Sequence, residues 1–125
     1  MTDLRGKIEK ALRLGGGTHT YQDIVDAELA GRMQWWSGIN AVLVTEVHEA
    51  PQRKTLHFFL GAGDLEEIKL LLPIPMEWGR RQGCTHASFI GRPGWARTFL
   101  AGEGWKPSKL VLFEREIPCP KVEQM

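Results

Sequence analysis

The chain has 125 residues and a formal net charge of +1, from 16 Lys and Arg residues against 15 Asp and Glu residues. A chain of this length fits one hydrophobic core, so we expect a single domain over residues 1–125. Because the charges nearly balance, no overall field draws the protein to nucleic acid or to an anionic membrane. We therefore expect no nucleic-acid partner and no membrane partner.

The cysteines and the N-terminal segment bear on metal binding and location. Cys84 and Cys119 stand far apart and form no C-x-x-C pair, and the histidines lack partners at metal-ligand spacing, so we expect no metal site. The first twelve residues are amphipathic and charged, unlike a signal peptide, and no stretch of eighteen apolar residues occurs. These features favour a reduced, cytoplasmic setting.

Two helices are predicted at the start of the chain. The first apolar residues recur at helical spacing until three consecutive glycines end the pattern, which predicts a helix over residues 3–14. Thr20 is followed three positions later by Asp23, the spacing of a capping box. This spacing predicts a second helix over residues 20–30.

Three apolar runs follow, "MQWW", "NAVLVTEV" and "KTLHFFL", and they predict three antiparallel strands with a turn at Pro51 between the second and third. Trp35 and Trp36 are adjacent, so in a strand they point to opposite faces of the sheet. We expect one in the core and the other at a contact surface, which favours a protein partner or self-association. The alternative is that a helix covers the second face.

The second half alternates helices and strands. Residues 64–82 have a helical composition, but Pro73 and Pro75 predict a broken helix, over residues 64–72 and 75–82. "THASFIG" predicts a strand, "GWARTFLAGEG" a short helix, and "KLVLFERE" a last strand. This order predicts an α+β fold, with a mixed, mainly antiparallel sheet flanked by helices.

The segment "EWGRRQGCTHASFIGRPGWARTFLAGEGWKPSKLVLFERE" resembles the C-terminal half of the GNAT fold of N-acetyltransferases. In that fold a helix ending in a basic residue and Gly leads to a strand, a short helix ending in Gly and an aromatic residue, and a final strand. The motifs "GGGTHT", "VTEV" and "GRPGW" are similar to those of small GNAT-like proteins of bacteriophages and prophages. The resemblance implies a single GNAT-like domain, located in the host cytoplasm or the virion.

The resemblance also implies an acetyl-CoA site at "GAGDLEEI", where the family binds the diphosphate on a loop before a helix. The residues concerned are Gly61, Ala62, Gly63, Asp64 and Leu65. The family's leading Arg or Gln is absent, and the carboxylates of this loop would repel a diphosphate. The alternative is a plain strand-to-helix turn capped by Asp64. Acetyl-CoA binding is therefore expected to be weak or lost.

The catalytic tyrosine of many GNAT enzymes is also absent, because the matching position is Leu100 and the one tyrosine is Tyr21. Glu46 and His57 lie on neighbouring predicted strands and oppose one another if the turn centres between Pro51 and Gln52. A carboxylate there could orient an imidazole as a general base for an amine substrate. The alternative for this pair is a surface ion pair.

The segment "GRPGWARTFL" carries one further candidate. Trp95 and Phe99 are one helical turn apart, which favours packing against the sheet, whereas Arg92 could present a guanidinium fork to a carboxylate or phosphate. Two functions follow. The first is a phage-type GNAT-fold protein with a degenerate acetyl-CoA site, acting as a non-catalytic binding or virion-associated structural domain. The alternative is an N-acetyltransferase that acts on an amine.

Overall fold

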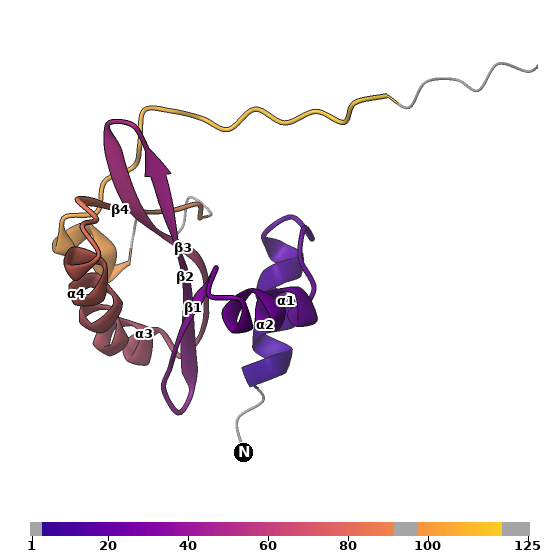
Figure 1. The fold of residues 1–125 in the computed structure, drawn as a ribbon. Coiled ribbons are helices and arrows are strands. Elements are labelled where there is room, and N and C mark those ends of the chain that lie inside the picture. The colour runs from indigo at the N-terminus through magenta and orange to yellow at the C-terminus, as the bar shows by residue number, and fades with distance from the viewer. Residues whose placement is uncertain (1–3, 92–97, 119–125) are drawn as a thin grey trace, which may run out of the picture. The chain divides into compact units, whose positions relative to one another are not determined.

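The computed structural model describes residues 4–91 and 98–118. The chain divides into two compact units, Met1–Pro93 and Gly94–Met125. The first unit contains a four-stranded sheet in the order β1-β2-β3-β4. Figure 1 shows α1 and α2 on one face of this sheet and α3 and α4 on the other. The first unit is therefore a sheet covered by helices on both faces.

The two N-terminal helices are α1 (Leu4–Leu14) and α2 (Tyr21–Leu29), as the apolar spacing predicted. The capping box of α2 is complete. The Asp23 N–H donates to the Thr20 hydroxyl at 3.2 Å, and the Thr20 N–H donates to the Asp23 carboxylate at 2.8 Å. Two of the otherwise unsatisfied N–H groups at the helix start are thereby satisfied.

The sheet consists of β1 (Gln34–Ser37), β2 (Ala41–Ala50), β3 (Arg53–Gly63) and β4 (His86–Phe89). The first three strands are antiparallel, as predicted, and β4 runs parallel to β3. The β2–β3 turn holds only Pro51 and Gln52, because Ala50 pairs with Arg53. Pro51 suits this place since it has no N–H to offer to a strand.

The other face is covered by α3 (Leu65–Leu71) and α4 (Pro73–Arg81). They join at Leu72, whose backbone is also helical, so the predicted break lies at Pro73. The second segment starts two residues earlier than predicted. This is because Pro73 and Pro75 both fall in the first turn of α4, where a missing N–H costs nothing.

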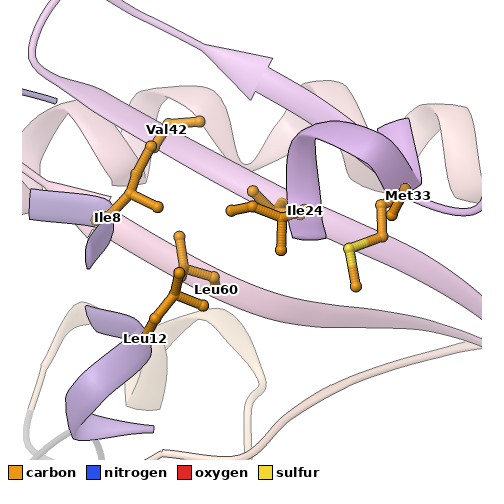
Figure 2. Packing of buried hydrophobic residues seen from close by; sticks show 9 residues of the cluster. Ile8, Leu12, Ile24, Met33, Val42 and Leu60 are labelled. Atoms are coloured by element: carbon orange, nitrogen blue, oxygen red, sulfur yellow. The ribbon is translucent and has the colours of Figure 1, made fainter. Parts of the chain in front are cut away.

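The main core lies between the sheet and the two N-terminal helices (Figure 2). Ile8 and Ile24 from the helices, and Val42 and Leu60 from the strands, are each at most 6% exposed. On β2 the five residues from Ala41 to Thr45 are all buried, because helices cover both faces there. From Glu46 onward β2 becomes progressively exposed.

Trp35 and Trp36 do point to opposite faces, and both are half-buried. The Trp35 indole donates to the Ile24 carbonyl at 3.3 Å, on the α2 side. Trp36 donates to the Thr45 hydroxyl at 2.9 Å and packs edge-on against Trp78 of α4, with ring centroids 5.6 Å apart. The alternative expectation, that a helix lies over the second face, is therefore confirmed, because α4 packs against Trp36.

The second unit contains a 3-10 helix, η2 (Phe99–Glu103), which ends at Gly104 in the left-handed conformation with φ 87°. The short helix predicted from residue 94 is thus present in its last part, and residues 92–97 lie outside the described residues. The strand predicted over residues 109–116 is wrong, because residues 105–118 contain no strand. A strand needs a neighbour for its backbone, and the described part of this unit holds no other strand.

We predict that Gly63→Ala destabilises the first unit by at least about 2 kcal/mol. Gly63 has φ 108°, and a Cβ there would overlap the backbone carbonyl of Asn40. Gly61→Ala is the matched control, because its Cβ would meet only movable side-chain ends, Leu43 at 3.3 Å and Ile68 at 4.0 Å. Urea unfolding followed by tryptophan fluorescence measures both. Equal losses in the two variants would contradict this account.

Candidate functional site

The register of the β2–β3 hairpin brings Glu46 directly opposite His57. The turn centres between Pro51 and Gln52, so the pairing that the sequence predicted for that turn is confirmed. Val42 and Val44 of β2 face α1 and α2 in the core, and Glu46 follows in the same alternation. Glu46 and His57 therefore share the face of the sheet that carries α1 and α2.

Two further side chains join this pair, and we call Glu46, His48, His57 and Ser88 the histidine cluster. His48 Nε2 lies 2.8 Å from the Glu46 carboxylate, and His57 Nδ1 lies 2.9 Å from the Ser88 hydroxyl. The two imidazole rings stack with centroids 4.8 Å apart and planes inclined by 19°. The cluster is a row of four polar groups that crosses β2, β3 and β4.

The environment lowers the pKa of His57 below its ordinary value of 6.5. Burial is the largest cause because it disfavours the charged imidazolium. The neighbouring His48 lowers the pKa further by charge repulsion, whereas Glu46 raises it. His57 is therefore a neutral imidazole at neutral pH, which is the form that can accept a proton.

The cluster lies next to the point where β3 and β4 separate. The parallel pairing runs from Thr55–His86 to Phe58–Phe89 and ends there, one pair beyond His57 and Ser88. β3 continues to Gly63 beside β2 only, among the strands the structure describes. An extended ligand chain can pair with the edge of a strand that is open in this way.

The separation coincides with a bulge in β3. Val44 pairs with Leu60 and Thr45 with Phe58, so Phe59 has no partner position on β2. Bulges of this kind bend a strand and redirect its side chains. The Phe59 ring meets the His19 ring at 4.7 Å, which brings the loop between α1 and α2 to the border of the site.

The glycines of the predicted acetyl-CoA loop lie in β3, where contacts within the fold bear on what could replace them. Gly61, Ala62 and Gly63 are still part of β3 and pair with β2. A side chain at Gly61 would press on Leu43 beneath α3, and one at Gly63 would strike Asn40. Gly63 is thus required by the fold, whether or not a diphosphate approaches it, whereas Gly61 lies against side-chain ends that can move.

The start of α3 differs from the predicted capping turn. Asp64 stands at the N-cap position, but its side chain makes no capping hydrogen bond, and its N–H donates to the Asn40 carbonyl at 2.9 Å. Asp64 is therefore the N-cap residue, as the plain strand-to-helix turn predicted, although its side chain makes no capping hydrogen bond. Leu65 is the first helical residue, and Glu66 is exposed beside it.

Sequence reasoning missed what Glu67 does. Its carboxylate accepts hydrogen bonds from the backbone N–H groups of Ile39 and Asn40, the latter at 2.7 Å. The Glu67 carboxylate is therefore turned toward the β1–β2 turn, which it anchors, and not toward the predicted diphosphate loop. Gly38 belongs to the same arrangement, because a side chain there would overlap this carboxylate.

The structure assigns no joint site to the remaining candidates. Arg92 and Trp95 lie outside the described residues. Tyr21 stacks under the Arg5 guanidinium, 4.6 Å from its ring centroid, and packs edge-on against Trp35. Leu100, where the resemblance would place a catalytic tyrosine, is buried.

Metal binding and membrane spanning can be judged for the described residues. Within residues 4–91 and 98–118, no three His, Cys, Asp or Glu side chains are grouped so that they could hold a metal ion. No helix in the same ranges is both long enough and apolar enough to cross a membrane.

Solved structures share this fold at low sequence identity. A mutant of the TTHA1254 protein of Thermus thermophilus is 15% identical with a TM-score of 0.65, over 93% of this chain and 95% of that one. A tetramutant of the BH1408 protein of Bacillus halodurans is 15% identical with a TM-score of 0.58, over 93% and 90%. A Pyrococcus furiosus protein described as a "putative acetyl transferase" is 12% identical with a TM-score of 0.56, over 89% and 93%.

These likenesses confirm the predicted fold class, a small α+β fold with a four-stranded mixed sheet flanked by helices. The sequence matches no protein-family model and no curated protein. At such identities, similarity shows the fold alone, and the chemistry has to be argued from the side chains.

We predict opposite shifts of the His57 pKa in two neighbouring variants. His48→Gln removes a repelling charge and should raise the pKa of His57, whereas Glu46→Gln removes an attracting charge and should lower it. NMR titration of the imidazole resonances measures both. Shifts in the same direction would contradict the arrangement described for the cluster.

The same lowered pKa has a consequence for stability. Because the unfolded chain binds a proton at His57 more readily than the folded one, the free energy of unfolding should fall as pH drops below about 6.5. His57→Gln should weaken this loss.

Proposed function

We propose that the protein is an acyl-CoA-dependent N-acyltransferase in which His57 is the general base. The observation that carries this proposal is a neutral, half-buried imidazole held by Ser88 next to the separation of β3 and β4. The fold shared with the Pyrococcus furiosus protein supports the choice of reaction class. The acceptor would be a primary amine.

Ser88 determines which nitrogen of His57 serves as the base. In the tautomer that the proposal uses, the Nδ1–H donates to the Ser88 hydroxyl, and Nε2 keeps the lone pair that accepts the proton of the incoming amine. Attack by the amine nitrogen on the thioester carbon forms the amide bond and breaks the C–S bond. His57 takes the ammonium proton, and the thiolate takes a proton from solvent, because Leu100 stands where the resemblance would place a catalytic tyrosine.

The residues at the end of β3 and the start of α3 suit the amide-containing chain of acetyl-CoA better than its diphosphate. When bound, acetyl-CoA supplies the acyl group as a thioester. The open edge of β3 over residues 59–63 suits the amide-containing chain of the molecule, whose groups could pair with the strand backbone. The diphosphate would meet the exposed Asp64 and Glu66, and α3 is only seven residues long. We therefore expect weak binding.

A second candidate is a non-catalytic binding or virion-associated structural domain that kept the fold. The acidic loop and the buried Leu100 in place of a tyrosine favour it. Its association with a phage rests on the resemblance of the short motifs "GGGTHT", "VTEV" and "GRPGW" alone. This candidate requires that acetyl-CoA does not bind and that no transfer occurs.

We predict that His57→Gln lowers kcat/KM for acetylation of a primary amine by roughly 10²- to 10⁴-fold, as expected for loss of a general base. His86→Gln is the control, because His86 is exposed and contacts Thr85. Acetyl transfer is followed by thiol release across an amine panel. Equal activity of wild type and His57→Gln, or no transfer at all, would overturn the proposal.

A separate prediction concerns cofactor affinity. Calorimetry should give an acetyl-CoA Kd above about 100 μM, or about −5.5 kcal/mol, and Glu66→Gln should tighten it about two- to five-fold by removing a repelling charge. Glu67→Gln is the matched control, because that carboxylate is turned to the β1–β2 turn. A wild-type Kd near 1 μM would show that the acidic loop does not limit binding.

A further inference from the structure

The contact with Ser88 sets which edge of the His57 ring meets the hydroxyl, but it does not set the plane of the ring. The hydroxyl lies 2.9 Å from Nδ1. The torsion that turns an imidazole about its bond to Cβ is broad, so one hydrogen bond at one nitrogen leaves the ring free to tilt about that contact. A second contact is needed to fix the direction in which Nε2 points.

The ring of His48 supplies this second contact. The two imidazoles are stacked, with centroids 4.8 Å apart and planes inclined by 19°. Glu46 pairs directly with His57, and His48 lies two residues further along β2, so its ring reaches His57 diagonally across the strand pair. Because the two rings lie face to face, a tilt of the His57 ring toward β2 is opposed by the His48 ring.

The His48 ring is itself held in place by Glu46. Its Nε2 lies 2.8 Å from the Glu46 carboxylate, and the side chains of His48 and Glu46 are 54% and 25% exposed. An ionised carboxylate accepts hydrogen bonds but does not donate them, so the Nε2–H of His48 is the donor. This bond keeps a largely exposed ring against His57, where a free side chain would turn between rotamers.

We propose that His48 is a positioning residue, whose ring, held by Glu46, fixes the plane of the His57 ring. The effect on rate rests on the proposed function, because the Nε2 lone pair has to point at the proton of the amine. A small misplacement of a reacting group is enough to slow a reaction. The order of the His57 ring is a property of the protein alone and is measurable without any acyl transfer.

Two substitutions of His48 separate its ring from its charge. His48→Ala removes the ring, whereas His48→Phe keeps a flat ring that can stack on His57 without a bond to Glu46. Both remove the imidazole that repels a charge on His57, so the rates are compared at about pH 8, where His57 is neutral in every variant. We expect kcat/KM for a primary amine to fall roughly tenfold in His48→Ala and to stay within about threefold of wild type in His48→Phe.

NMR relaxation of the His57 ring C–H groups tests the position directly. The order parameter of the ring should fall in His48→Ala and should be retained in His48→Phe. Glu46→Val should also lower it, and the double variant of Glu46→Val and His48→Ala should show no further fall, because Glu46 acts through His48. His86→Ala is the matched control, because His86 is an exposed histidine that contacts Thr85. Near-ultraviolet circular dichroism checks that each variant is folded.

The two measurements distinguish a failure of this proposal from a failure of the proposed function. An unchanged order parameter in His48→Ala would overturn the positioning role of His48. Equal losses in His48→Ala and His48→Phe would also overturn it, because the polar groups of the imidazole and not its stacking would then matter. Absence of acyl transfer in the wild type would overturn the proposed function, and the order parameters would still decide whether His48 positions His57.

Discussion

The register of β2 against β3 is the constraint on which the rest of the first unit depends. A two-residue turn at Pro51 and Gln52 starts the ladder, and the bulge at Phe59 shifts it by one position. Before the shift the inward positions are filled by Glu46 and His57, and after it by Val44 and Leu60. A slip of one residue in either strand would turn its inward side chains to the opposite face of the sheet, away from α1 and α2. Core and candidate site are therefore fixed by the same hydrogen bonds.

The far end of the same hairpin is fixed by contacts that compete with ligand binding. Asp64 donates its N–H to Asn40, and Glu67 receives the N–H groups of Ile39 and Asn40. Gly63 lies against the same backbone. A diphosphate needs free N–H donors, and these contacts commit the Asp64 N–H to the β1–β2 turn. The contacts of Asp64 and Glu67 in this loop are thus explained by the anchoring of the β1–β2 turn, without any cofactor.

Local sequence patterns predicted most of the fold. They missed contacts between residues that are far apart in the sequence. The capping box at Thr20 and the turn at Pro51 depend on residues within three positions of each other, and both were found. The pairing of Ser88 with His57 spans a parallel connection through two helices, so no spacing rule reveals it. His48 could have been found, because it lies two residues from Glu46 on the same strand face. The strand over residues 109–116 failed because apolar alternation indicates the capacity to pair and not the presence of a neighbour.

The charge state of His57 and the nature of its hydrogen-bond partner limit what the histidine cluster can do chemically. His57 is kept neutral mainly by burial, and its bonded partner is a neutral hydroxyl rather than a carboxylate. The Glu46 carboxylate is hydrogen-bonded to His48 instead. The His48 ring in turn stacks on the His57 ring. A base of this kind can accept a proton, but its bonded partner carries no charge to stabilise the imidazolium, and only the nearby Glu46 favours that form. Under the proposed function, such a base suits an amine that is already a good nucleophile and needs only the removal of a proton.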